Sequence, residues 1–171
     1  MLNKIRIGAA GVALVSALGM ASAANAAAST TATATAQILD TLQLQVNGTS
    51  QLDFGAIAPN TGGSVTVYGD GTATSCGGTL VCTGTTTPVN LQVKGTSGQT
   101  VGVTLPTGAS LPVTLTSGLN SMDITAFNVD SSTVSLDGNW DDFYVGGTLS
   151  VASGQAAGTY TGTFSVSVEY Q

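Results

Sequence analysis

The densest cluster of residues able to do chemistry is a short acidic stretch around the single tryptophan. Asp137, Asp141 and Asp142 lie close to Trp140 in the sequence, and paired carboxylates beside an aromatic ring are found in some sugar sites. Asp137, Asn139 and Asp141 also match the opening ligands of a calcium loop. That loop requires a glycine where Asp142 stands and a closing glutamate, which is missing. The pattern favours a solvated turn with a half-buried tryptophan, and a structural calcium ion stays an open alternative.

The N-terminal residues have the pattern of a secretory signal peptide. Lys4 and Arg6 precede a short apolar run, and small residues occupy the possible cleavage positions after Ala26 or Ala23. The apolar run is short for a membrane span and has no stop-transfer flank. We therefore expect a cleavable signal over residues 1–26, export of the chain and no membrane insertion.

Cleavage of this signal would leave a strongly acidic chain. One basic residue, Lys94, and all nine acidic residues follow it, so the formal net charge becomes 1 − 9 = −8. A single lysine cannot neutralise a nucleic-acid backbone or support a basic membrane-binding helix, which excludes both classes of partner. Because charged residues make up only 7% of the chain, neutral polar residues must cover most of the surface.

The two cysteines are the other candidate reactive groups. Cys76 and Cys82 form a pair in a chain expected to be exported, which predicts a disulfide. Closing so short a loop contributes about 2 kcal/mol, enough to fasten a loop but not to hold up a fold. A metal site is disfavoured because the chain has no histidine and no second cysteine pair. Without histidine the common nucleophile–base arrangements lack a base, so we expect no enzyme activity, no cofactor and no metal ligand set.

The rest of the chain carries the period of two that is typical of β-strands, and no helical period. Residues 42–46 alternate, and the following Asn47-Gly48 predicts a hairpin with residues 49–55. Residues 69–87, which contain both cysteines, have no periodicity and are expected to form a loop. The sequence predicts an all-β antiparallel sandwich over residues 42–171. Further strands are expected at residues 64–68, 89–94, 100–105, 111–115, 122–129, 143–151 and 159–170.

The last of these expected strands alternates up to the penultimate residue. Chain ends usually fray unless they are tied down, so this apolar face must dock on its own domain or on a partner. The residues of this edge are its opening glycine and the apolar side chains that share one face, namely Gly158, Tyr160, Phe164, Val166, Val168 and Tyr170.

On these residues the chain resembles the pilin subunits of chaperone–usher fibres. Those subunits have a C-terminal alternating strand with a penultimate tyrosine and a glycine fourteen positions from the end, which are Tyr170 and Gly158 in this sequence. The segments LDFG near the start, GGTL at Gly146–Leu149 and GTYTGTF near the end also resemble a family of bacterial secreted β-domains of unassigned function. This second resemblance covers nearly the whole mature length.

The pilin resemblance implies an immunoglobulin-like sandwich that lacks its last strand. A periplasmic chaperone would lend a strand, and at an outer-membrane usher the N-terminal arm of a neighbouring subunit would replace it. The resemblance places this donor arm within residues 27–41 and the mature protein in an extracellular fibre or at the cell surface. Alanine adds little buried area, so the register would depend mainly on Ile38. The arm residues expected to face the groove are Thr30, Ala32, Ala34, Ala36 and Ile38.

Two alternatives stay open. The chain could be a complete, monomeric, secreted or cell-surface sandwich that binds carbohydrate or a matrix component through residues 69–87 or the Asp137–Asp142 turn. A less favoured alternative is a surface-layer or matrix protein that packs through its neutral, threonine-rich face.

Overall fold

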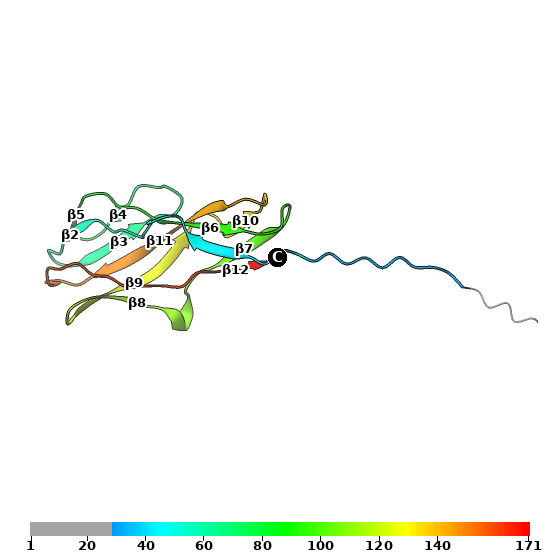
Figure 1. The fold of residues 1–171 in the computed structure, drawn as a ribbon. Helices are drawn as coiled ribbons and strands as arrows, with labels where there is room; N and C mark the ends of the chain where they lie inside the picture. Colours follow the sequence, from blue (N-terminus) through cyan, green and yellow to red (C-terminus); the bar gives the residue numbers. More distant parts are fainter. Residues whose placement is uncertain (1–28) are drawn as a thin grey trace, which may run out of the picture. The chain divides into compact units, whose positions relative to one another are not determined.

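The computed structural model describes residues 29–171, and the expected signal peptide lies outside them. The chain divides into two compact units, Met1–Ala36 and Gln37–Gln171. In the first unit, residues 29–36 contain no helix or strand. The second unit contains every strand that the structure describes, and all of their pairings are antiparallel (Figure 1). The predicted all-β antiparallel sandwich is confirmed. No helix within residues 29–171 is long and apolar enough to cross a membrane.

The larger sheet is built around one long strand, β11. The first half of β11 pairs with β6; its second half pairs with β3 on that same edge and with β9 on the other. Beyond these neighbours, β1 pairs with β6, β4 with β3 and β8 with β9. The strands of this sheet are β1 (Gln43–Val46), β3 (Gly63–Val67), β4 (Ser75–Cys76), β6 (Val89–Lys94), β8 (Val113–Ser117), β9 (Asn120–Val129) and β11 (Asp141–Val151).

A second sheet faces this one and contains the C-terminus. Its order is β10 (Thr133–Ser135), β7 (Thr100–Thr104) and β12 (Ser167–Tyr170). A separate pair joins β2 (Ala56–Ala58) to β5 (Val81–Thr83), and one short 3-10 turn, η1 (Gly108–Ser110), precedes β8. Because β12 pairs only with β7, it forms an edge of its sheet.

Alternation along the strands builds an apolar core in two clusters. Between the two sheets, Val93, Val101, Phe143 and Val145 are at most 1% exposed. A second cluster gathers around Val65 and the strands β3, β9 and β11. No polar or charged side chain is buried in the part of the chain that the structure describes. Burial of β-branched residues from both sheets is the main force that holds the sandwich together.

The sequence pattern located the long strands well and missed the short ones. Residues 89–94 match β6 at both ends, and β1, β3, β7, β8, β9 and β11 lie within two residues of their predicted bounds. The prediction of a loop over residues 69–87 is wrong, because this segment contains β4 and β5. Strands of two or three residues are too short to show a period, and here β3 and β2 supply their pairing partners.

The predicted hairpin at Asn47-Gly48 is also wrong. A turn does form there, with the Ser50 N–H donating to the Asn47 carbonyl at 3.1 Å. The segments before and after the turn do not pair with each other, however. The first pairs with β6, and beyond the turn Asp53 bridges to Thr87, just ahead of β6, with N···O distances of 2.8 and 3.0 Å. The segments before and after the turn therefore lie along the same edge, which is formed by β6 and the residues just ahead of it. The turn between them projects from this edge as a bulge.

Candidate functional site

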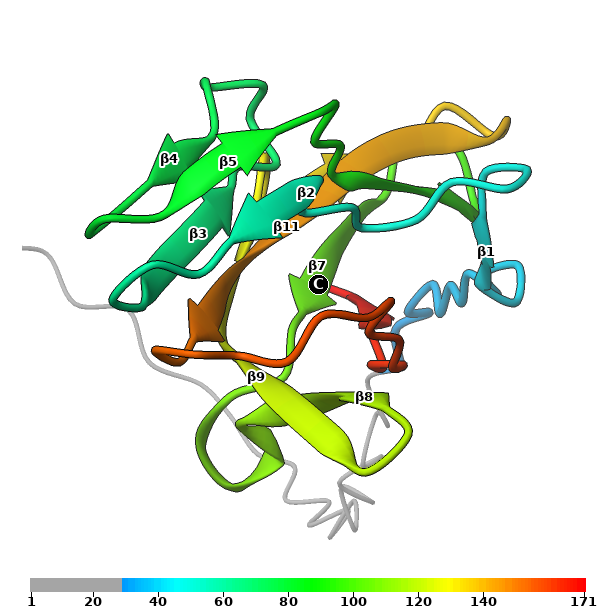
Figure 2. The ribbon, with the colours of Figure 1, turned by 90° about the vertical axis from the view of Figure 1, so that its left-hand side faces the viewer.

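A groove of about 1250 Å³ lies between two chain segments that are far apart in the sequence. Residues 44–59 line one wall, and residues 155–166 line the other. In Figure 2 the second wall is the orange-to-red segment that crosses the view between β9 and β2 before it reaches β12. The floor is apolar and consists of core side chains from both clusters, namely Val89, Leu91, Leu115, Met122, Ile124, Leu149 and Val151.

The C-terminal wall of the groove has few backbone partners. Thr161 makes an isolated bridge to Thr116 of β8, with N···O distances of 2.9 and 3.0 Å, and only Ser167–Tyr170 forms a strand. Within residues 29–171, no backbone hydrogen bond involves residues 162–166. The predicted continuous strand over residues 159–170 is therefore wrong in extent, because this stretch has no neighbouring strand. Its side chains still alternate: Phe164, Val166 and Val168 are half-buried, and Ser165 and Ser167 between them are exposed.

The opposite wall also presents an unpaired edge. The strand β1 pairs with β6 along one edge, and no described strand pairs with its other edge. Backbone N–H and C=O groups on an unpaired edge can receive a further strand. Two such edges therefore border a groove whose floor is apolar. An extended segment with small or apolar side chains is the shape that fits this site.

The structure brings four of the six predicted edge residues into the groove. Gly158, Tyr160, Phe164 and Val166 line it, and the Phe164 ring packs on Phe127 with ring centroids 4.5 Å apart. A Cβ atom at Gly158 would lie 2.5 Å from the Ser117 hydroxyl oxygen, so this wall passes close to the end of β8. The remaining two residues, Val168 and Tyr170, lie in β12 and pack against the core.

Tyr170 has a contact that the sequence pattern did not predict. Its hydroxyl donates to the Asp40 carbonyl at 2.9 Å and accepts from the Thr96 N–H at 2.8 Å. The Asp40 N–H in turn donates to the Thr96 hydroxyl at 2.7 Å. A Cβ atom at Gly95 would lie 2.4 Å from the tyrosine hydroxyl oxygen. These contacts, which we call the Tyr170 clip, fasten the end of the chain to the base of the N-terminal arm. Residues so distant in sequence give no local signal.

The candidate arm residues fall in both units of the chain. Thr30, Ala32, Ala34 and Ala36 lie in the first unit, in the stretch without helix or strand. Ile38 belongs to the second unit, where its side chain is 95% exposed. Leaving a large aliphatic side chain in water forgoes about 1.5–3 kcal/mol that burial would provide. The exposed isoleucine at the base of the arm is therefore a feature that a partner could use.

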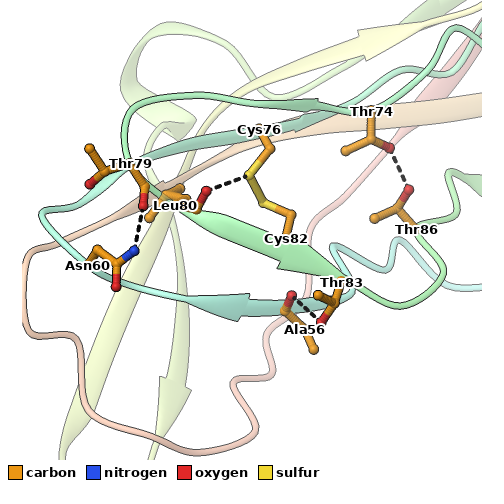
Figure 3. The surroundings of a disulfide bond; sticks show 9 residues. All are labelled: Ala56, Asn60, Thr74, Cys76, Thr79, Leu80, Cys82, Thr83 and Thr86. Carbon is orange, nitrogen blue, oxygen red and sulfur yellow. Dashed lines mark hydrogen bonds between the residues drawn. A yellow bond between two sulfur atoms is a disulfide. The ribbon is translucent and has the colours of Figure 1, made fainter.

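The predicted disulfide between Cys76 and Cys82 is confirmed, and it connects β4 to β5 (Figure 3). Hydrogen bonds attach this region to β2 and its flanks. The Asn60 side-chain amide donates to the Thr79 carbonyl at 2.9 Å, and the Thr83 hydroxyl donates to the Ala56 carbonyl at 3.5 Å. The disulfide joins two short strands at the periphery of the domain, and neither cysteine lines the groove.

The acidic stretch around Trp140 folds as a turn held by its own carboxylates. Asp137 accepts a hydrogen bond from the Asn139 N–H at 2.7 Å, and Asp141 accepts one from the Asp137 N–H at 3.1 Å. Trp140 is half-buried. Among the described residues, no group of three or more acidic, histidine or cysteine side chains is placed to hold a metal ion. The carboxylates of this turn shape the backbone.

A comparison with protein-family models identifies the family of this domain. The model described as "Domain of unknown function (DUF4402)" matches residues 44–170, from β1 to the end of β12. The chain belongs to this family. The all-β structure is compatible with a secreted β-domain, and no pilin model matches. No curated protein and no solved structure matches the chain. Both walls of the groove lie within this DUF4402 domain, whereas the candidate arm residues precede it.

Proposed function

We propose that this DUF4402 protein is a structural subunit of an extracellular fibre, assembled by donor-strand complementation. The observation that carries the proposal is the groove, which has an apolar floor and two unpaired backbone edges. A strand inserted between these edges would pair with both and would cover the floor. Backbone hydrogen bonds would supply affinity, and alternate side chains would set the register. The proposed role involves no catalysis.

The donor is the N-terminal arm of a second copy. Residues 29–39 contain no charged side chain, so the arm can enter an apolar groove without desolvating a charge. Their threonines and alanines alternate, which gives the arm one small, largely apolar face and one hydroxyl face. The arm is nearly as long as the C-terminal wall at residues 155–166. Ile38 is the largest side chain on the inner face and would fix the register in the groove.

The proposal also says what must happen before assembly. An open apolar groove with unpaired edges invites non-specific association, so the exported subunit needs a temporary strand in the periplasm. A chaperone would supply that strand, and an outer-membrane usher would bring in the arm of the next subunit. The protein would then leave the periplasm as part of a fibre or remain at the cell surface.

The test is to delete residues 27–39 from the mature chain. The deleted protein, refolded with its disulfide, should stay monomeric by size-exclusion chromatography, and electron microscopy should show no filaments. The intact mature chain should form filaments under the same conditions. Normal filaments from the deleted protein would refute the arm as donor. A stable monomer from the intact mature chain would instead favour the monomeric alternative.

A point variant gives a sharper version of this test. Ile38→Asp places a charge on the inner face of the arm and should block assembly without changing the thermal stability of the subunit. Thr33→Asp places the same charge on the outer face and is the matched control, which should assemble. If Ile38→Asp assembles as well as Thr33→Asp, the register proposed here is wrong.

A further inference from the structure

The turn after β1 contains the one Asn-Gly pair of the sequence, Asn47-Gly48. Because the predicted hairpin does not form, pairing across this turn does not account for the dipeptide. The Asn47 N–H donates to the Asn90 carbonyl at 3.0 Å, and the Asn47 carbonyl accepts from the Ser50 N–H at 3.1 Å. The main chain of Asn47 is therefore fixed on both sides, which holds the turn in place.

The side chain of Asn47 and the peptide nitrogen of Gly48 have few contacts. Both residues are exposed. The Asn47 side-chain nitrogen donates one long hydrogen bond, at 3.4 Å, to an Asp142 carboxylate oxygen. Within residues 29–171, no hydrogen bond engages the Asn47 side-chain oxygen or the Gly48 N–H. The Asn47 amide carbon and the Gly48 nitrogen are thus neighbours in the chain, and no hydrogen bond to the nitrogen keeps them apart.

Gly48 leaves the space that a reaction between these two groups needs. Its φ is +59°, and a Cβ atom there would meet nothing within 4 Å. Without a side chain, glycine does not shield its own nitrogen and can adopt conformations that other residues rarely reach. The Gly48 nitrogen can therefore approach the Asn47 side-chain carbon without obstruction from a Cβ atom or from a neighbouring segment.

The two Asp-Gly pairs within the domain are held differently. The Asp70 carboxylate accepts from the Thr72 N–H at 2.9 Å, and the Asp137 carboxylate accepts from the Asn139 N–H at 2.7 Å. In each pair the side chain is bonded to the nitrogen two residues further on, in a local turn. This bond competes with any approach to the nitrogen of the glycine. The Asn47 side-chain oxygen has no such bond, so the structure singles out this position.

We propose that Asn47 is a site of self-modification, at which the chain converts its own amide to a carboxylate. The Gly48 nitrogen bonds to the side-chain carbonyl carbon of Asn47, and the bond from that carbon to the amide nitrogen breaks. The amide nitrogen leaves as ammonia and takes the proton that the Gly48 nitrogen loses. Water from the solvent then opens the five-membered imide ring. Opening at the side-chain carbonyl gives aspartate at this position, and opening at the main-chain carbonyl gives isoaspartate.

The product changes the contacts of the turn. A carboxylate replaces the amide that donates to Asp142, so a hydrogen bond becomes a repulsion between like charges. In isoaspartate the carbonyl that accepts from Ser50 also leaves the backbone, which gains one carbon atom. The turn joins residues 44–46 to residues 50–57, which line the same wall of the groove. The modification therefore loosens this wall at the point where its two halves join.

The test is to store the purified mature chain, residues 27–171, in mildly alkaline buffer and to follow it by peptide mass spectrometry. The peptide that contains Asn47 should gain one mass unit, and an isoaspartyl methyltransferase should label it. The intact chain should elute later from an anion exchanger. The internal controls are the other asparagines of the domain, Asn60, Asn90, Asn120, Asn128 and Asn139. A rate at Asn47 no higher than at these positions overturns the proposal.

Two variants assign the reaction to this pair of groups. Asn47→Gln keeps a side-chain amide but requires a larger ring, so it should lose both the mass gain and the change in elution. Gly48→Ala places a Cβ atom beside the attacking nitrogen and should slow the reaction several-fold. Circular dichroism should show that both variants are folded. A change in elution that persists in Asn47→Gln would overturn the assignment.

A third variant measures the consequence for the domain. Asn47→Asp carries the charge of the product without the extra backbone carbon, and should lower the thermal midpoint by about 4 °C. Asn60→Asp, which adds the same charge in a turn away from Asp142, is the matched control. Equal midpoints for the two variants would refute the predicted repulsion. None of these measurements depends on filament formation, so their outcome is separable from that of the fibre proposal.

Discussion

At the residue scale, the Tyr170 hydroxyl joins three distant parts of the chain. It bonds to backbone groups of Asp40 and Thr96, so the last strand, the turn after β6 and the base of the arm meet at one oxygen atom. Both partners are main-chain groups with few other ways to satisfy their hydrogen bonds. The penultimate tyrosine therefore acts inside its own domain, whatever the groove binds.

Tyr170→Phe should lower the free energy of unfolding by about 1–3 kcal/mol, because it leaves the Thr96 N–H and the Asp40 carbonyl without this partner. Urea denaturation measures the change. Tyr144→Phe is the matched control, since its hydroxyl lies on an exposed face and accepts from the Asn90 side chain. The control should lose less than about 1 kcal/mol. Equal losses in the two variants would contradict the clip.

Gly146 shows how closely the central strands approach. A Cβ atom there would lie 2.1 Å from the Val67 carbonyl oxygen and 2.8 Å from the Gly69 nitrogen, both of which are backbone atoms. Gly146→Ala should destabilise the domain by about 3 kcal/mol, because the paired strands must move apart. Gly77→Ala, whose nearest neighbour would be 3.4 Å away, should change little. Thermal denaturation compares the two, and a stable Gly146→Ala would mean that β3 and β11 can separate without cost.

At the element scale, the pair of short strands joined by the disulfide, β4 and β5, is peripheral to the sandwich. The bond closes a small ring between β4 and β5 and lies away from the groove. Replacing both cysteines, Cys76→Ser with Cys82→Ser, should cost about 2 kcal/mol of stability and should leave the sandwich and its assembly intact. Chemical denaturation with and without a reductant measures the loss. Complete unfolding of the double variant would show that the whole domain depends on this disulfide for its stability.

The strands with a strong alternation are the part of the fold that could be predicted from the sequence. The alternation in β6 and β11 is strong because a face of each strand is covered by the core, and their bounds were predicted to within two residues. The apolar face of residues 164–170 was predicted from the same period, and its half-buried side chains follow it.

Pairing between distant segments could not be predicted from a local pattern. The period gave a single strand over residues 159–170, yet residues 162–166 have no backbone partner in the described chain. Asn47-Gly48 predicted a hairpin, because the dipeptide reports a turn but not which strands pair beyond it. The groove arises from the same long-range information, since its walls come from opposite ends of the domain. The residues of one wall were predicted, but those of the other were not.

At the scale of the whole molecule, binding of the arm in the groove can be tested with the arm and the groove in separate molecules. A peptide with the sequence of residues 29–40, added to the chain lacking residues 27–39, should raise its thermal midpoint. At a hundredfold excess over the dissociation constant, the gain in stability is about 2.7 kcal/mol. The Ile38→Asp peptide is the control and should have no effect at the same concentration.

Hydrogen exchange gives the same prediction a local readout. Amides at residues 162–166 should exchange rapidly in the arm-deleted chain, because they lack backbone partners. The peptide should slow their exchange and should leave that of β6, which is already paired on both edges, nearly unchanged. A peptide that stabilises the domain without protecting residues 162–166 would bind somewhere other than the groove.

The Tyr170 clip also determines how the domain responds to tension. A pull on the arm reaches Asp40 before it reaches β1, and Asp40 is bonded to both Thr96 and Tyr170. The force should therefore divide between the turn that follows β6 of the larger sheet and β12 of the second sheet. We expect this to shield the hydrogen bonds between β1 and β6 from opening one at a time. Through the hydroxyl oxygen of Tyr170, the C-terminal strand thus holds the base of the N-terminal arm against a pull.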